Sequence, residues 1–208
     1  HGRSLAVIGL GYVGLPLALA AAAAGYRVVG FDVDAGKVES LRAGRSYIKH
    51  IGEADLRAAT AAGRLDATTD FAALRTVDAI IICVPTPLTA HRAPDLTYVI
   101  RTTEAIVPHL RRGHLVVLES TTWPGTTEEV MKPILERTGL KSGEDFFLAY
   151  SPEREDPGNP AFTTRSIPKV VGGDGPVALA RADALYGAIV AGTVKVSSTR
   201  TAEAVKLT

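Results

Sequence analysis

The stretch Gly9-Leu10-Gly11-Tyr12-Val13-Gly14 decides the fold, because it matches the pattern G-x-G-x-x-G. The pattern alone is a weak signal, but here it follows the apolar run Leu5–Ile8 and precedes the alanine-rich stretch Leu15–Ala24. Strand, glycine turn and helix in this order open a dinucleotide-binding unit. The first glycine permits the tight turn, the second lets the backbone approach a pyrophosphate, and the third lets helix and strand pack closely. We therefore expect Gly9, Gly11 and Gly14 to form a phosphate site at a helix N-terminus.

A second apolar run, Arg27–Phe31, ends at Asp32, which lies 18 residues after Gly14. This is near the spacing of the acidic residue that binds the adenosine ribose. A carboxylate there accepts hydrogen bonds from the ribose hydroxyls of NAD and repels the extra phosphate of NADP. Lys37 is close enough in the sequence to weaken that preference. The sequence thus favours NAD as the cofactor.

Short apolar runs alternate with helical stretches along most of the chain, and these runs do not alternate with polar residues. This is typical of strands that are covered on both faces. Strands alternating with helices indicate an α/β fold with a doubly wound, mostly parallel, Rossmann-like sheet. The expected strands are Leu5–Ile8, Arg27–Phe31, Ala79–Val84, Leu115–Leu118, Phe146–Tyr150, Lys169–Gly172 and Thr193–Val196, and the expected helices are Leu15–Ala24, Gly36–Ala43, Glu53–Ala62, Leu96–Leu110, Thr127–Arg137 and Val177–Ile189.

Two of these helices have residues suited to their N-termini. Asp95 is expected to cap the helix Leu96–Leu110. Thr126 is expected to cap the helix Thr127–Arg137, with Glu129 three residues later completing a capping box.

Composition and charge exclude several classes of protein. The 208 residues are 46% hydrophobic and 22% charged, which is ordinary globular usage. A net charge of +1 leaves no basic excess for nucleic acid. The single cysteine, Cys83, excludes an intramolecular disulfide and a cysteine zinc cluster. The five histidines lack the spacing of metal ligands, so we expect no metal site.

An uncharged stretch, residues 4–26, is long enough to cross a bilayer. Gly9, Gly11, Gly14 and Pro16 interrupt its first half, so we interpret it as strand, turn and helix and expect no membrane span.

Ligands of such sheets sit at the carboxyl ends of the strands. Val84-Pro85-Thr86-Pro87 and Glu119-Ser120-Thr121-Thr122 both follow apolar runs there. Thr86 and Thr121 are candidates to place hydroxyls near a nicotinamide, although each alone is also typical of a turn or a helix cap.

The charged loop Ser151–Asn159 follows the run Phe146–Tyr150, again at a carboxyl end. Glu153 is a candidate to move a proton, directly or through water, and Arg154 to bind an anionic group. A loop this rich in charge is also typical of a solvated turn.

Several motifs together resemble the nucleotide-sugar dehydrogenases, the UDP-glucose/GDP-mannose dehydrogenase family. The resemblance extends over nearly the whole chain in family order. The Pro-Glu-Arg form of the charged loop is most similar to the branch that oxidises UDP-N-acetylhexosamines, whereas UDP-glucose enzymes more often carry Pro-Glu-Phe-Leu. The motifs are Gly9–Pro16, Val84–Pro87, Pro94–Val99, Glu119–Thr121, Ser151–Arg154 and Thr201–Leu207.

The resemblance implies a four-electron oxidation of the sugar C6 alcohol to a carboxylate, with two NAD and covalent intermediates on a cysteine. It also implies roles for particular residues. Glu153, Lys206 and Thr121 would be catalytic, and Arg154, Glu155 and Lys206 would lie near the UDP-sugar substrate. NAD would be bound by Gly9, Gly11, Tyr12, Val13, Gly14, Asp32, Lys37, Val84, Thr86, Ser120 and Thr121.

The chain departs from the full family pattern in its catalytic cysteine, because no Gly-Gly-x-Cys-like motif is present. We therefore expect residues 4–197 to be an NAD-binding domain that binds cofactor without completing turnover. Residues 198–208 would begin the helix that leads to a dimerisation and UDP-binding part. The resemblance further implies a cytoplasmic protein that forms a homodimer or a higher homo-oligomer.

Three alternatives stay open. One is a UDP-glucose 6-dehydrogenase, and another is a different NAD enzyme such as a β-hydroxyacid dehydrogenase. The third is a module that senses nicotinamide nucleotides without chemistry, in which Glu153 and Lys206 would be scattered over the solvent-facing surface.

Overall fold

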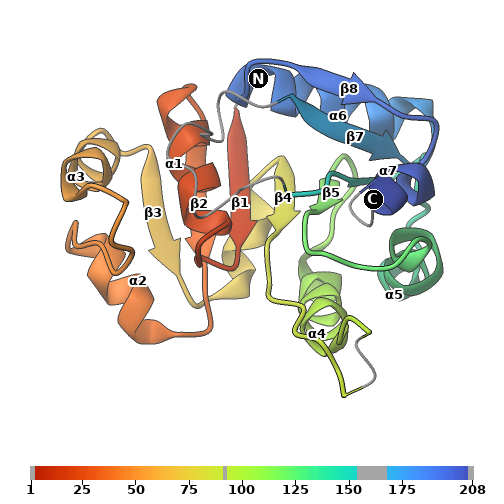
Figure 1. Ribbon diagram of the computed structural model, residues 1–208, viewed down its shortest axis with the longest axis horizontal. Coiled ribbons are helices and arrows are strands. Elements are labelled where there is room, and N and C mark those ends of the chain that lie inside the picture. The colour runs from red at the N-terminus through yellow and green to blue at the C-terminus, as the bar shows by residue number, and fades with distance from the viewer. Residues whose placement is uncertain (1–2, 91–92, 154–167, 206–208) are drawn as a thin grey trace.

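The computed structural model describes residues 3–90, 93–153 and 168–205. One eight-stranded sheet runs through it in the order β3-β2-β1-β4-β5-β6-β7-β8 (Figure 1). All neighbouring strands are parallel except β6 and β7. The α/β, mostly parallel fold is therefore confirmed. The strands are β1 (Ser4–Ile8), β2 (Arg27–Phe31), β3 (Leu65–Thr68), β4 (Ala79–Ile82), β5 (Leu115–Leu118), β6 (Phe147–Tyr150), β7 (Lys169–Gly173) and β8 (Thr193–Lys195).

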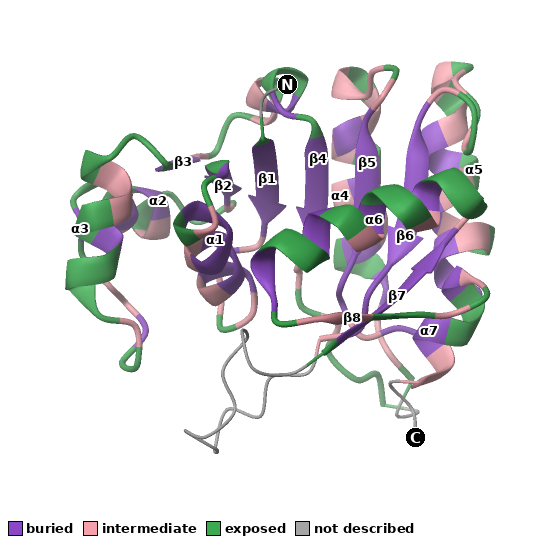
Figure 2. Cartoon of the chain, turned by 90° about the horizontal axis from the view of Figure 1, so that it is seen from above, coloured by how far each residue is buried: buried purple, intermediate pink, exposed green. Residues whose placement is uncertain are grey.

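Helices cover both faces of this sheet, and Figure 2 shows β1, β4, β5 and β6 buried between them. Consecutive residues of β1 illustrate why the apolar runs are continuous. Leu5 and Val7 belong to the core beneath α1 and α6, whereas Ala6 and Ile8 belong to the core beneath α4 and α7. The α-helices are α1 (Gly14–Ala23), α2 (Ala35–Arg42), α3 (Glu53–Ala61), α4 (Thr97–Ile106), α5 (Lys132–Leu135), α6 (Pro176–Ile189) and α7 (Thr199–Val205). The shorter helical segments are η1 (Phe71–Thr76), η2 (Val107–His109), η3 (Thr126–Met131) and η4 (Glu136–Thr138), of which η3 is a π-helix.

The edge strand β3 was not expected from the sequence. It has four residues, of which Leu65 and Ala67 are buried and Asp66 is exposed. A run this short, with only two apolar positions, does not stand out from a loop.

The capping box at Thr126 and Glu129 was a wrong prediction. The Thr126 hydroxyl donates to the carbonyl of Trp123 at 2.8 Å, and the Glu129 N–H donates to the carbonyl of Gly125 at 2.7 Å. The expected helix is instead a π-helix followed by short α and 3₁₀ turns.

Glu203 of α7 does what the capping box was expected to do. Its carboxylate accepts from the Gly125 N–H at 2.5 Å, the Thr127 N–H at 2.8 Å and the Thr127 hydroxyl at 2.6 Å. A buried acid more than 70 residues away thus satisfies the helix terminus, and no local pattern predicts this.

Asp95 acts close to where it was expected. Its Oδ1 accepts from the N–H of Thr97 at 2.9 Å, and the N-cap position itself is Leu96. The Asp95 carboxylate therefore accepts from the first turn of α4 although Asp95 lies one residue before the N-cap.

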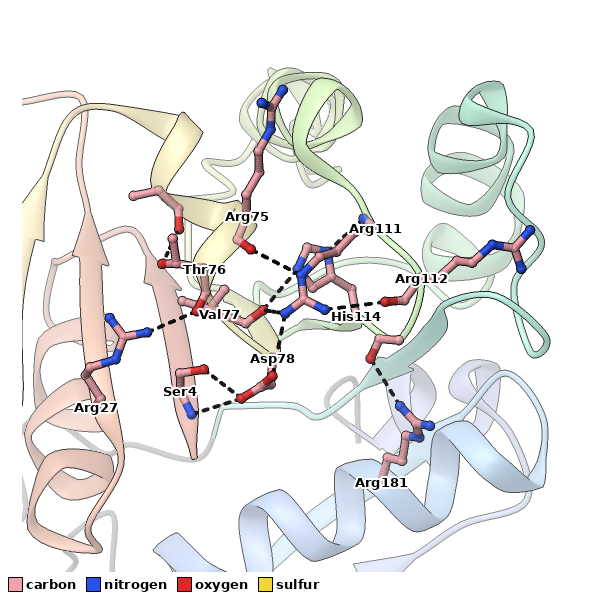
Figure 3. A network of polar contacts seen from close by, with 12 residues as sticks. Ser4, Arg27, Arg75, Thr76, Val77, Asp78, Arg111, Arg112, His114 and Arg181 are labelled. Atoms are coloured by element: carbon pink, nitrogen blue, oxygen red, sulfur yellow. Dashed lines mark hydrogen bonds and ion pairs between the residues drawn. The ribbon is translucent and has the colours of Figure 1, made fainter. Parts of the chain in front are cut away.

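The amino ends of the strands are tied together by polar contacts (Figure 3). Asp78 accepts from the Ser4 hydroxyl at 2.6 Å and forms an ion pair with Arg111 at 3.5 Å. Buried His114 accepts from the Arg111 N–H at its Nδ1, so its Nε2 donates to the Val77 carbonyl at 3.1 Å. Burial lowers the pKa of His114 to about 4 and keeps the ring neutral. These side chains are engaged with the backbone and with one another, and the ligand site lies at the opposite, carboxyl ends.

Among the described residues, no helix combines the length and the apolar character that a membrane crossing requires.

Candidate functional site

A cavity of about 640 Å³ opens at the carboxyl ends of the strands, where the loops after β1, β2, β4, β5 and β6 meet. Its volume is within the range of small-molecule and cofactor sites. The residues of the sequence prediction that line it are Gly9, Gly11, Tyr12, Val13, Asp32, Lys37, Val84, Thr86, Ser120, Thr121 and Glu153.

The glycine turn between β1 and α1 is shaped by close backbone contacts. Gly9 has a φ of +94°, and a Cβ there would lie 2.5 Å from the carbonyl oxygen of Cys83. A Cβ on Gly14 would lie 1.7 Å from the carbonyl oxygen of Gly9. A Cβ on Gly11, in contrast, would meet no atom within 4 Å. Gly9 and Gly14 are therefore required by the turn itself, and Gly11 leaves open space over the backbone.

Asp32 closes the same turn from the end of β2. Its Oδ2 accepts from the Leu10 N–H at 2.9 Å, and its Oδ1 accepts from the Asp34 N–H at 3.0 Å. Lys37 of α2 places its ammonium 3.6 Å from Oδ2. Each carboxylate oxygen can accept a second hydrogen bond, so a ribose hydroxyl still finds an acceptor on Asp32.

These residues fit a dinucleotide in chemistry and in shape. The open space over Gly11 is adjacent to the first turn of α1, where helix N–H groups lack intrahelical acceptors and attract an anion. Tyr12 is 61% exposed and Val33 is 91% exposed, and both line the same cavity. A pyrophosphate at the glycine turn, a ribose at Asp32 and an adenine beside Val33 match this arrangement.

The loops that follow β4 and β5 are hydrogen-bonded to each other at the part of the cavity that Val84 and Ser120 line. The Ser120 hydroxyl donates to the Val84 carbonyl at 2.6 Å, and the Tyr150 hydroxyl donates to the Ser120 carbonyl at 3.1 Å. Thr86 and Thr121 line the cavity beside this junction, as does Glu153 from the loop after β6. The structure thus brings a candidate acid–base residue to the cavity that holds the glycine turn.

Three buried polar residues, one in this wall and two behind it, were not recognised in the sequence as site residues. Glu119 lines the cavity and accepts from the Tyr186 hydroxyl at 2.5 Å. Lys169 places its ammonium 3.2 Å from Glu119 Oε2 and 3.7 Å from Glu153 Oε2. Glu119 stands next to Ser120 in a strand-end motif, which is a usable signal. Lys169 and Tyr186 look like an ordinary strand start and an ordinary helix residue.

Burial has a strong effect on the ionisation of these groups. It raises the pKa of Glu119 to about 7, and the Lys169 ammonium opposes this increase. For Lys169 itself burial disfavours the charge, but the Glu119 and Glu153 carboxylates outweigh burial and raise its pKa. Lys169 is therefore a buried cation between two acids.

The remaining predicted residues are placed as follows. Gly14 packs behind the turn, against Gly9 and Cys83, and is not among the lining residues. Arg154, Glu155 and Lys206 lie outside the described residues. Among the described residues, no group of three or more His, Cys, Asp or Glu side chains is arranged to hold a metal ion.

Comparisons with known proteins agree with this geometry. The model of the NAD-binding domain of the UDP-glucose/GDP-mannose dehydrogenase family matches residues 3–190. The UDP-N-acetyl-D-glucosamine 6-dehydrogenase of Pseudomonas aeruginosa is 42% identical over 205 residues, which are 98% of this chain and 48% of that protein. The structure of UDP-D-ManNAc dehydrogenase from Pyrococcus horikoshii superposes with a TM-score of 0.91 at 38% identity, covering 98% of this chain and 49% of the other.

A UDP-glucose dehydrogenase from Pyrobaculum islandicum superposes with a TM-score of 0.85 at 36% identity, covering 99% of this chain and 48% of the other. The chain thus spans about half the length of these relatives.

Proposed function

Because the chain belongs to the UDP-glucose/GDP-mannose dehydrogenase family and matches its NAD-binding domain, we propose that the whole protein is a UDP-N-acetylhexosamine 6-dehydrogenase. It oxidises the C6 alcohol of the sugar to a carboxylate with two NAD. The observation that carries this proposal is the shared cavity, in which Glu153 lies together with the glycine turn and Asp32.

Bound NAD would supply the hydride acceptor, and this chain's residues would bind and orient it. The N-terminus of α1 would attract the pyrophosphate, Gly11 would leave room for it, and Asp32 would accept a hydrogen bond from the ribose. Tyr12, Val13, Lys37, Val84, Thr86, Ser120 and Thr121 complete the cofactor contacts in this proposal.

The chemistry of the sugar is assigned to the charged residues. Glu153 accepts or returns the proton of the alcohol, directly or through water, and Thr121 lines the same cavity. Lys206 stabilises the developing oxyanion, and Arg154 and Glu155 contact the UDP-sugar. The nucleophilic cysteine belongs to the second half of the protein.

The choice of an N-acetylhexosamine is supported by two observations. The Pseudomonas relative that is 42% identical carries that activity in its name, and the loop here has the Pro-Glu-Arg sequence at Pro152–Arg154. The Pyrobaculum structure keeps UDP-glucose as the second candidate substrate.

A sensing module without chemistry is the alternative from another class. In such a module Glu153 has no reason to face the cofactor cavity, yet it lines that cavity and its side chain is 13% exposed. This placement favours the enzyme.

The organisation of the whole protein is part of the proposal. Residues 4–197 form the NAD-binding domain, and residues 198–208 begin the helix toward a UDP-binding and dimerisation part. The protein is cytoplasmic and assembles as a homodimer or a higher homo-oligomer, and its product enters polysaccharide biosynthesis.

The test is an assay of the full-length protein with NAD and either UDP-N-acetylglucosamine, UDP-N-acetylmannosamine or UDP-glucose. We expect two NADH per sugar with one of the N-acetylhexosamines and at least tenfold lower kcat/KM with UDP-glucose. A preference for UDP-glucose would overturn the substrate assignment, and NAD binding without NADH formation from any of the three would favour the sensor.

A further inference from the structure

Three buried polar residues and the partly buried Glu153 form a cluster on one side of the cofactor cavity, and we call them the acid–lysine cluster. They are Glu119 after β5, Glu153 after β6, Lys169 of β7 and Tyr186 of α6. Glu119 and Glu153 line the cavity, whereas Lys169 and Tyr186 lie behind them and are not among the lining residues. The cluster therefore joins the site to two elements, β7 and α6, that do not themselves line the cavity.

Lys169 is the centre of this cluster. Its ammonium lies 3.2 Å from Glu119 Oε2 and 3.7 Å from Glu153 Oε2, and it donates to the carbonyl of Pro152 at 3.3 Å. One side chain thus contacts both the carboxylate of Glu153 and the backbone of the residue before it.

The strand β7 also holds the residue at the start of this loop. The Ser151 hydroxyl donates to the Val170 carbonyl at 2.7 Å. Lys169 and Val170 together therefore attach Ser151, Pro152 and Glu153 to β7, just where the chain leaves β6.

Because these charges are largely shielded from water, each of them depends on its partner. The side chain of Lys169 is 7% exposed, that of Glu119 is fully buried, and that of Glu153 is 13% exposed. Removing one partner of a buried ion pair leaves an uncompensated charge, which is costly. Separating these charges is therefore costly, unlike in a surface pair whose members separate freely.

We propose that Lys169 is a positioning residue, which holds the Glu153 carboxylate at the cavity wall by bridging it to Glu119 and by binding the Pro152 carbonyl. This inference rests on the proposed function, because it assigns Glu153 the proton transfer of that reaction. Tyr186 completes the support by donating to Glu119 from α6.

The titratable groups around Glu119 come from every element packed against it. They are Lys169 of β7, Glu153 after β6, Tyr186 of α6, Tyr150 of β6 and, near Lys169 and Tyr186, Cys83 after β4. Burial raises the pKa of Glu119 to about 7, although the Lys169 charge acts to lower it. Loss of that charge raises the pKa of Glu119 further, by about one unit or more, because an opposite charge this close has an effect of that size.

The test uses the full-length protein and four variants. Lys169→Met removes the charge, and Lys169→Arg keeps it. Glu119→Gln removes one acid. The double variant Glu119→Gln/Lys169→Met removes both charges of this ion pair, so neither of the two is left buried without the other, and a folded protein stays available. Lys195→Met is the matched control, because Lys195 is an exposed lysine on the next strand, β8, paired with Asp183 at 3.4 Å.

We expect Lys169→Met to lower kcat about 100-fold, which is the low end of what acid–base catalysis contributes. The KM for NAD should stay within about twofold of the wild-type value. The kcat of Lys169→Arg should be at least tenfold higher than that of Lys169→Met. In the background of Glu119→Gln, adding Lys169→Met should lower kcat at least tenfold. Lys195→Met should behave as wild type.

A second readout follows the ionisation of Glu119 by carboxyl ¹³C NMR. The resonance titrating near pH 7 should disappear in Glu119→Gln and move to higher pH in Lys169→Met, because the ammonium 3.2 Å away stabilises the Glu119 carboxylate. The readout that a merely structural role would not give is the loss of kcat at unchanged KM for NAD, with recovery in Lys169→Arg.

A folded double variant with the kcat of Glu119→Gln would overturn the proposal, as would an unshifted Glu119 titration in Lys169→Met. Failure of the proposed function is distinguishable, because the wild-type protein would then form no NADH.

Discussion

Replacing each of two glycines of the phosphate turn with alanine should separate the stability of the turn from its binding of cofactor. The Cβ of Gly14→Ala would lie 1.7 Å from the Gly9 carbonyl oxygen and 3.3 Å from the Cβ of Cys83. Reaching even 3.0 Å, the shortest distance that Cβ atoms tolerate, requires a movement of at least about 1.3 Å, and the atom that must move belongs to the backbone of a tight turn. Overpacking of this kind costs about 3 kcal/mol. In a domain of this size that lowers Tm by about 6–12 °C.

Gly11→Ala should have the opposite profile. Its Cβ would meet no protein atom within 4 Å, and Gly11 is not among the glycines with positive φ, so Tm should change by less than about 2 °C. The added methyl group occupies the space proposed for the pyrophosphate. NAD affinity should therefore fall at least tenfold, which is about 1.4 kcal/mol.

Gly187→Ala is the matched control for both variants. Gly187 is exposed in α6, and a Cβ there meets nothing within 4 Å. It should gain about 1 kcal/mol of stability and bind NAD as wild type. Thermal unfolding by circular dichroism and calorimetric titration with NAD measure the two effects. Wild-type NAD affinity in Gly11→Ala, or a wild-type Tm in Gly14→Ala, would refute the reasoning.

Two further predictions concern stability. Because His114 has its pKa lowered to about 4 by burial, the unfolded chain binds a proton that the folded chain excludes, so the free energy of unfolding should fall by about 3 kcal/mol as pH drops from about 6.5 to about 4. His114→Gln should flatten this slope in urea unfolding measured across that pH range, and an unchanged slope would count against it. Glu203→Gln should lower the free energy of unfolding by about 2 kcal/mol, because one amide oxygen cannot replace both carboxylate oxygens that accept from Gly125 and Thr127. Glu129→Gln, which affects an exposed pair with Arg200, should cost under about 1 kcal/mol, and equal losses in the two variants would contradict the capping role of Glu203.

The fold could be predicted from the sequence because its signals are local. Strands buried on both faces produce unbroken apolar runs, and the observed bounds of β2 and β5 are those expected. The glycine turn and Asp32 were likewise recognisable, since their spacing reflects the geometry of one strand–turn–helix unit. β3 was missed because an edge strand with two buried apolar residues lacks that signal.

Contacts between distant segments could not be predicted in this way. Glu203 satisfies a helix terminus more than 70 residues away, so the local capping pattern at Thr126 was misleading. Lys169 looks like an ordinary strand start in the sequence, and only the sheet order β5-β6-β7 brings it between Glu119 and Glu153. The acids of the cavity wall were visible as strand-end residues, but the lysine that supports them was not.

The central claim, that this chain binds NAD through the glycine turn and Asp32, is tested most directly by calorimetric titration with NAD and NADP, repeated on Asp32→Ala. The structure and its family predict saturable binding of NAD, weaker binding of NADP, and at least a tenfold loss of NAD affinity in the variant, because a hydrogen bond to a charged group contributes about 1.5–3 kcal/mol. Absence of NAD binding, a preference for NADP, or unchanged NAD affinity in Asp32→Ala would contradict it.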